Sequence, residues 1–234
     1  VIFFLDIFDF FYRLNFVNFL KKNRINKFDV IFDVGAHEGE SIKFFNKYFD
    51  VKKIYSFEAS PINFANLKKN IQNRKFKSSI ILENLGLGLK TEKRQLNQTI
   101  ESSSSTFNEI NNDSKYYNKK KFLLNFFNKK NYISKIDVNM TSLKNYIIIN
   151  KVDKIDLLKI DTEGFEFDVL LGLEDEMKKV NFIFFEHHYD DMYKKNYTYS
   201  DISKLLKYNN FKILHKNKMP FRKTFEYLWV NKEI

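Results

Sequence analysis

The sequence predicts an α/β fold in which helices cover both faces of a mostly parallel β-sheet. Two observations support this prediction. Short apolar runs, typical of buried strands, recur along the chain and are separated by helical patterns. The first run, Phe28–Val34, carries Asp33 near its end and leads into a turn that contains Gly35 and Gly39. Because open α/β sheets bind ligands at the carboxyl ends of their strands, this turn is the first candidate for a functional site.

The other elements follow in chain order. Strands are expected at Lys53–Glu58, Ser79–Asn84, Ile155–Ile160, Val180–Phe185, Phe211–His215 and Glu226–Val230. Helices are expected from Gly39 to about Phe49, from Pro61 through Ile71, and over Met140–Asn150, Thr162–Leu173 and Ser200–Tyr208. Pro61 suits a first helical turn, and Thr141 or Ser142 and Ser200 are the expected N-caps. The least regular part is residues 91–135.

The acid at the end of the second strand indicates a nucleoside site. Glu58 follows Asp33 by 25 positions, and the two oxygens of a carboxylate can accept both hydroxyl groups of a ribose. The turn has the spacing D-x-G-x-x-x-G and lacks the central glycine that lets a pyrophosphate approach the backbone. We therefore expect S-adenosylmethionine. A dinucleotide-binding oxidoreductase or epimerase is the alternative, although a Tyr-x-x-x-Lys pair with a catalytic Ser is missing.

Three stretches, DVGAHEGES, YSFEASPINFANLKKN and DLLKIDTEGFE, resemble the FkbM-type family of S-adenosylmethionine-dependent methyltransferases. The resemblance covers roughly Val30 to His188. It implies a Rossmann-like class I fold, with a seven-stranded, mostly parallel sheet and an antiparallel C-terminal hairpin strand. In the turn, His37 stands where the family more often has Asn. The residues expected around the cofactor are Asp33, Gly35, Ala36, His37, Gly39, Glu58, Ala59, Asn84, Leu85 and Gly86.

The family also indicates the reaction. FkbM-type enzymes serve glycan and polyketide tailoring, so we expect O-methylation of a hydroxyl group on a sugar or polysaccharide precursor. The acceptor would be a small molecule or a glycan, such as a nucleotide-linked sugar. Methylation of nitrogen, or of a lipid or polyketide, is the alternative with the same cofactor.

Catalysis is expected over the ends of the strands that precede Asp161, Glu163, Glu186 and His187. In one mechanism, Glu163 or His187 removes the proton of the acceptor hydroxyl. In another, Asp161, Glu186 and His187 hold Mg, Mn or Fe(II), an arrangement similar to the metal site of catechol-type O-methyltransferases. In a third interpretation, the acids only cap the next helix. Lys159 shares the strand face of Asp161 and would pair with Asp161 or Glu163.

The N-terminal residues 1–27 are predicted to form an aromatic, helical segment. We expect its helix to pack on the domain or to join two copies in a homo-oligomer, with membrane-surface contact as a third interpretation. Asp6, Asp9 and Arg13 interrupt the apolar run, which argues against a transmembrane segment, and no basic region precedes it as in a secretory signal. Residues 28–234 form the predicted methyltransferase domain, with a Lys/Asn-rich insertion at about 107–134.

The charge and cysteine content limit the function further. The net charge is +11, but no nucleic-acid-binding motif accompanies it, so we attribute it to surface lysines and expect no nucleic-acid partner. The chain has no cysteine, which excludes disulfides and thiolate metal sites and is typical of a reducing compartment. We therefore expect a cytoplasmic protein. The Ser102–Thr106 run is expected either as a solvated loop or close to the site.

Overall fold

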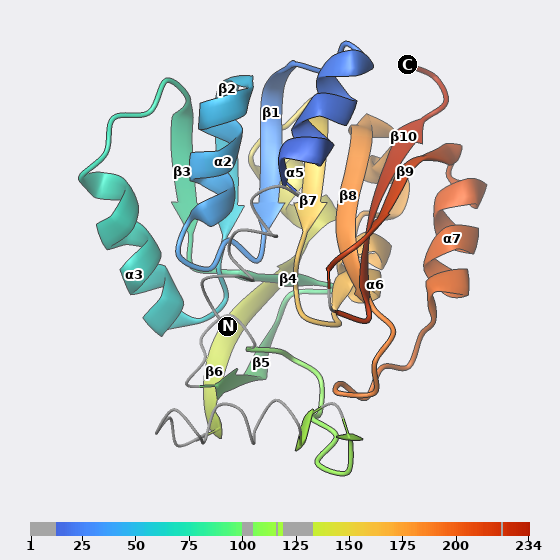
Figure 1. The fold of residues 1–234 in the computed structure, drawn as a ribbon. Helices are drawn as coiled ribbons and strands as arrows, with labels where there is room; N and C mark the ends of the chain where they lie inside the picture. The colour runs from blue at the N-terminus through green and yellow to red at the C-terminus, as the bar shows by residue number, and fades with distance from the viewer. Residues whose placement is uncertain (1–12, 100–104, 116, 119–132, 221) are drawn as a thin grey trace.

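The computed structural model describes residues 13–99, 105–115, 117–118, 133–220 and 222–234. Its centre is a seven-stranded sheet with the order β3-β2-β1-β7-β8-β10-β9 (Figure 1). The pairs from β3 to β8 are parallel, whereas β10 runs antiparallel to both neighbours, as predicted. The strands are β1 (Lys27–Val34), β2 (Asp50–Phe57), β3 (Ser79–Glu83), β7 (Ile155–Ile160), β8 (Val180–His188), β9 (Phe211–Lys218) and β10 (Thr224–Asn231).

Helices cover both faces of this sheet, because successive strand residues point to opposite sides. In β1, Ile31 packs on one face and Phe32 on the other. The face of Ile31 is covered by helical residues 13–22, α2 (Glu40–Tyr48) and α3 (Pro61–Gln72). The face of Phe32 is covered by α5 (Leu143–Ile149), α6 (Glu166–Leu171), the 3₁₀ helix η2 (Glu174–Lys179) and α7 (Tyr199–Tyr208). The two apolar cores leave the strand ends free for polar groups.

A second, three-stranded sheet was not expected from the sequence. It has the order β4-β6-β5, with β4 (Gly86–Gly88), β5 (Glu92–Thr99) and β6 (Ile133–Ser142). In Figure 1 it lies beyond the end of the large sheet to which the arrows of β1 and β7 point. This is the carboxyl end of the parallel strands, so the second sheet flanks the predicted ligand-binding edge.

The described part of the N-terminal segment packs on the large sheet. Residues 13–22 are helical, and Phe16, Val17 and Leu20 are buried. The Phe16 ring stacks on Phe184 of β8, with 4.6 Å between ring centroids. Residues 1–12, most of the Ser102–Thr106 run and more than half of the Lys/Asn-rich insertion lie outside the described residues. Among the described residues, no helix is both long enough and apolar enough to cross a membrane.

Several boundaries differ from the predictions. Among them, the helices expected over Met140–Asn150 and Thr162–Leu173 begin only at Leu143 and Glu166. β8 continues to His188, beyond the expected end at Phe185. Helix α7 begins at Tyr199 and is capped by Thr198, because Thr198 and Asp201 form a reciprocal capping box; Ser200 is inside the helix. The predicted cap of α5 is confirmed, since the Ser142 hydroxyl accepts a hydrogen bond from the Asn145 N–H at 3.1 Å.

Candidate active site

A cavity of about 490 Å³ lies at the carboxyl ends of β1, β2, β7 and β8. This volume is within the usual range of small-molecule sites. One half is formed by the turn after β1, the end of β2 and the start of β4, and we call it the β1–β2 half. The other is formed by the loop after β7, the end of β8, the β9–β10 hairpin and helical residues 13–22, and we call it the β7–β8 half.

The β1–β2 half is organised by Glu58. The backbone N–H of His37 donates to Glu58 Oε2 at 2.8 Å, and the N–H of Ser60 donates to Oε1 at 2.9 Å. Burial raises the pKa of Glu58, while these backbone hydrogen bonds act against the rise. The Asn63 side chain also hydrogen-bonds to the carboxylate, which has about four lone-pair sites in all and can still accept a ligand hydroxyl group.

The two glycines of the turn allow backbone conformations and close contacts that a side chain would prevent. Gly35 has φ +81°, and a Cβ there would lie 1.8 Å from the Asp161 carbonyl oxygen. Gly39 has φ +89° and packs against the side chains of Leu67 and Ile71. A glycine is therefore required at both positions for conformation and close packing.

The structure brings most of the residues expected at the cofactor to the cavity: Gly35, Ala36, His37, Glu58, Ala59, Leu85 and Gly86 line it. Asp33, Gly39 and Asn84 are not among the lining residues. Asp33 is fully buried beneath it, and Asn84 donates to the carbonyls of Glu58 and Ala59 at 2.8 and 3.2 Å. Asp33 and Asn84 therefore support the site through other residues.

Lys159 joins the two halves of the cavity. It lies beside Asp33 in the β1–β7 register, and its Nζ is 3.1 Å from Asp33 Oδ1 and 3.5 Å from Asp161 Oδ2. Burial opposes the charge of the ammonium group, but the carboxylates of Asp33 and Asp161 raise the pKa of Lys159. The expected partner Asp161 is confirmed, and Asp33 rather than Glu163 is the second.

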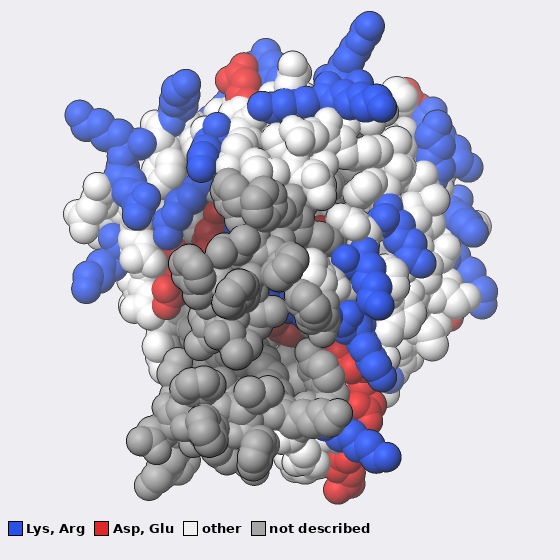
Figure 2. All heavy atoms as spheres, viewed as in Figure 1, with Lys and Arg blue, Asp and Glu red and all other residues white. Residues whose placement is uncertain are grey.

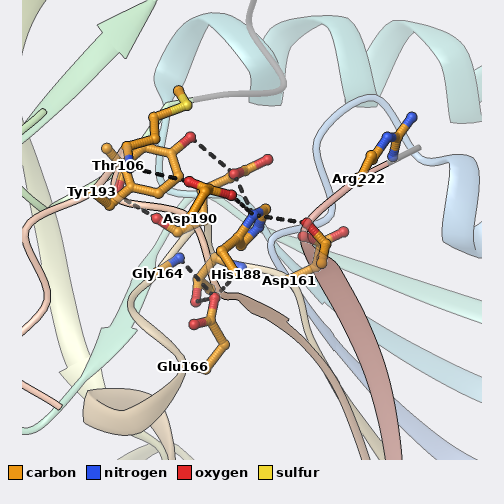
Figure 3. Close-up of polar contacts among 12 residues, drawn as sticks. Thr106, Asp161, Gly164, Glu166, His188, Asp190, Tyr193 and Arg222 are labelled. Atoms are coloured by element: carbon orange, nitrogen blue, oxygen red, sulfur yellow. Dashed lines mark hydrogen bonds and ion pairs between the residues drawn. The ribbon is translucent and has the colours of Figure 1, made fainter. Parts of the chain in front are cut away.

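The loop after β7 is held by a buried acid, Glu166. Its Oε1 accepts hydrogen bonds from the Thr162 N–H at 3.3 Å, the Thr162 hydroxyl at 3.1 Å and the Gly164 N–H at 2.9 Å. Its Oε2 accepts from the Tyr197 hydroxyl at 2.6 Å. Figure 3 shows Glu166 beneath Gly164, with Asp161 and His188 beside them. The loop therefore presents Asp161 and Glu163 to the cavity from a fixed backbone.

Two acids line the cavity from the neighbouring strands. Glu186 of β8 and Glu226 of β10 are directly paired in the antiparallel register. Burial, followed by the nearby Asp161 and Glu226, raises the pKa of Glu186 well above its usual value. The raised pKa favours the protonated form of Glu186, so one of the two acids can donate a hydrogen bond and the other can accept one.

The expectation that His187 faces the cavity is wrong. Neighbouring strand residues point to opposite faces, so Glu186 reaches the cavity and His187 does not. The His187 ring is buried on the other face against Tyr189, Tyr197 and Tyr199. Burial, with smaller effects of Lys195 and His188, lowers the pKa of His187 to about 3.

The metal site expected from Asp161, Glu186 and His187 is therefore not formed. Its imidazole lies across the sheet from its carboxylates. No set of three or more His, Asp or Glu side chains within the described residues is arranged to hold a metal ion. His187 is likewise misplaced for the role of a general base, whereas Lys159, Asp161 and Glu163 all line the cavity.

Sequence reasoning missed four residues of the site: His188, Tyr193, Glu166 and Glu226. For His188 a signal was present. Once Glu186 faces the cavity, the two-residue period of a strand places His188 on the same side. Tyr193, Glu166 and Glu226 come from a loop, a helix and a hairpin whose positions depend on long-range packing, and local pattern gives no signal for them.

The charge of the cavity is opposite to that of the surface. Its lining carboxylates, Glu40, Glu58, Asp161, Glu163, Glu186 and Glu226, outnumber its lysine and arginine side chains, Arg13, Lys159 and Arg222. In Figure 2, Lys and Arg side chains project from the margins of the visible face. An acidic cavity in a basic protein favours a ligand with positive charge or many hydroxyl donors.

A family model described as the methyltransferase FkbM domain matches residues 33–213. The chain belongs to this family. It is therefore an S-adenosylmethionine-dependent methyltransferase, and the dinucleotide-dependent alternative is set aside. A comparison with curated proteins finds no match.

Solved structures share the fold. Magnesium protoporphyrin IX methyltransferase from Synechocystis PCC 6803, with S-adenosylmethionine bound, is 8% identical, with a TM-score of 0.52 and coverage of 97% of this chain and 81% of that chain. The ribosomal protein L11 methylase from Lactobacillus delbrueckii subsp. bulgaricus is 14% identical, with a TM-score of 0.48 and coverage of 92% and 75%. The first confirms the class I methyltransferase fold that the resemblance implied.

Proposed function

We propose that this FkbM-family methyltransferase methylates a hydroxyl group of a sugar or polysaccharide precursor. The observation that carries the proposal is the composition of the β7–β8 half of the cavity. Asp161, Glu163, Glu186 and Glu226 line it together with aromatic rings such as Phe184. Carboxylates accept hydrogen bonds from hydroxyl groups, and apolar ring faces suit the C–H surfaces of a sugar.

The cofactor fits the β1–β2 half. Glu58 would accept the ribose hydroxyls, and Leu85 and Gly86 would border the adenine. Lys159 and the nearby carboxylates set the charge around the sulfonium end. When bound, S-adenosylmethionine supplies the methyl group. The acceptor oxygen forms a bond to the methyl carbon as the bond between that carbon and sulfur breaks, and the electron pair of the broken bond stays on sulfur.

Glu163 is the proposed general base. Its carboxylate lines the cavity and would take the proton that the acceptor hydroxyl loses. Glu186 is less suited to this task near neutral pH, because its raised pKa favours the protonated form, which is a hydrogen-bond donor. Orientation of the hydroxyl is the larger part of the catalysis, since methyl transfer is an in-line displacement.

Two experiments test this proposal. S-adenosylhomocysteine should raise the melting temperature of the protein, and NADPH should not. The protein is then incubated with S-adenosylmethionine and a panel of free sugars, amino sugars and nucleotide-linked sugars, and the products are analysed by mass spectrometry. We expect one added methyl group on a neutral hydroxyl of a panel member. Methylation of the amino group alone would favour the N-methyltransferase alternative, which the acidic lining also suits.

A further inference from the structure

The backbone of Glu163 is held from outside its own loop. Glu163 has φ +52°, a left-handed conformation that is uncommon for residues with a side chain. Its carbonyl oxygen accepts a hydrogen bond from the Thr106 hydroxyl at 2.8 Å, and the carbonyl of Gly164 accepts one from the Asn108 side-chain amide. The last residue of the serine run and the residues just after it therefore fix the main chain at the residue that we propose as the base.

The carboxylate of Glu163 is held by two further side chains. The Tyr193 hydroxyl donates to Glu163 Oε2 at 2.9 Å, and His188 Nε2 lies 3.4 Å from the same oxygen. Tyr193 comes from the loop after β8, and His188 is the last residue of β8. Because both contacts reach the same oxygen, together they fix the direction in which the carboxylate group points.

His188 is itself held from behind. Its Nδ1 lies 3.1 Å from the Thr224 hydroxyl and 3.6 Å from Asp190 Oδ2. Lys195 donates to the His188 carbonyl oxygen. Burial opposes a charge on His188, but the carboxylates of Asp190 and Glu163 raise its pKa to about 9. His188 thus lies between two carboxylates that favour its protonated form, and Figure 3 shows it beside Asp190.

We propose that His188 and Tyr193 are positioning residues that hold the Glu163 carboxylate toward the hydroxyl group of the acceptor. The proposal rests on the function proposed above. Neither residue lines the cavity, so each acts through Glu163 and not on the substrate. Displacement of a catalytic group lowers kcat far more than it weakens acceptor binding, because only the geometry of the reacting atoms is disturbed.

The test compares His188→Gln with His187→Gln. The two positions are adjacent, but only His188 is on the cavity side. Activity is measured as formation of S-adenosylhomocysteine with the panel member that gains a methyl group. For His188→Gln we expect kcat to fall roughly 10- to 100-fold, with little change in the acceptor KM. We expect S-adenosylhomocysteine to raise the melting temperature of His188→Gln by as much as that of the wild-type protein. His187→Gln should keep kcat within about twofold.

Tyr193→Phe tests the second contact, with Tyr189→Phe as its control. Tyr193→Phe should lower kcat about tenfold, since it removes one hydrogen bond to a charged group. The Tyr189 hydroxyl bonds to Tyr227 on the other side of the sheet, so its removal should not change kcat. The proposal is wrong if kcat stays at the wild-type value in both His188→Gln and Tyr193→Phe. It is also wrong if the control variants lose as much activity as these two.

A spectroscopic measurement separates this proposal from the choice of acceptor. In protein with ¹⁵N-labelled histidine, the ring signals of His188 are assigned by their loss in His188→Gln. Near pH 8 they should report an imidazolium in the unchanged protein and a partly neutral ring in Glu163→Gln. If this change occurs but no sugar is methylated, the proposed sugar acceptor is wrong, whereas the contact between His188 and Glu163 is confirmed. An unchanged His188 signal in Glu163→Gln would overturn the contact itself.

Discussion

The two halves of the cavity hold their polar groups in different ways. In the β1–β2 half, Glu58 is fixed by backbone N–H groups of His37 and Ser60. In the β7–β8 half, side chains fix side chains: Lys159 binds Asp161, and His188 and Tyr193 contact Glu163. A site held by the backbone survives most surface substitutions, whereas a site held by side chains depends on each partner. Substitutions in the β7–β8 half can therefore change the acceptor while the cofactor site in the β1–β2 half stays intact.

Removal of Lys159 should have the largest effect. Lys159→Met leaves Asp33 buried without its cation, and we expect a loss of about 3–5 kcal/mol in the free energy of unfolding. Urea unfolding measures this. Lys52→Met is the matched control, because Lys52 pairs with Asp29 at the surface and such pairs contribute about 0–1 kcal/mol. Equal losses in both variants would show that the β7–β8 half does not depend on its buried ion pair.

The next effect concerns binding in the β1–β2 half. Glu58→Ala removes the carboxylate expected at the ribose, and hydrogen bonds to a charged group contribute about 1.5–3 kcal/mol each. We expect the thermal stabilisation by S-adenosylhomocysteine to disappear. Glu83→Ala, at the end of the adjacent strand and outside the cavity, should keep it. A retained stabilisation in Glu58→Ala would mean that the ribose is bound elsewhere.

Tyr197→Phe should have an intermediate effect on stability. It leaves Glu166 Oε2 without its 2.6 Å hydrogen bond in a buried position, at a cost of about 1–3 kcal/mol. Tyr208→Phe is the control, since Tyr208 is almost fully exposed. The comparison of the halves also predicts lower kcat in Tyr197→Phe, because Glu166 holds the loop that carries Asp161. An unaltered unfolding curve would show that the loop is held by its backbone alone.

The smallest effect should appear at His187, which faces neither half. Its folded pKa of about 3 lies below the value near 6.5 in the unfolded chain, so the unfolded chain takes up a proton first as the pH falls. Stability should therefore fall below about pH 6.5, by at most about 1.4 kcal/mol per pH unit. His187→Leu should reduce this slope in urea unfolding between pH 6.5 and pH 5. The same slope in both proteins would contradict the buried, neutral imidazole.

The sequence allowed prediction of the elements whose signals are local. The strand-turn-helix around Gly35, the strand predicted at Lys53–Glu58 and the Ser142 cap all depend on nearby residues. The structure confirms each of these elements, with the strand at Asp50–Phe57. β5 was not predicted because Glu92–Thr99 is mostly polar and becomes a strand only by pairing with β6, far along the chain. The Thr198 cap does carry a local signal, since Asp201 stands at the third helical position and completes a capping box.

The β7–β8 half of the cavity was harder to predict for a physical reason. His187 and His188 have the same side chain and adjacent positions, and only the face of β8 decides which one reaches the site. Tyr193 and Glu226 reach the site from segments that fold back over it. Contacts between side chains distant in sequence set this half, and a single sequence does not show them.

Gly35 has one more consequence for how the enzyme works. Its backbone touches that of Asp161 with no side chain between them, and the Asp161 N–H donates to the Val34 carbonyl at 2.9 Å. A side chain at position 35 would therefore collide with the main chain of Asp161 and displace the loop that follows β7.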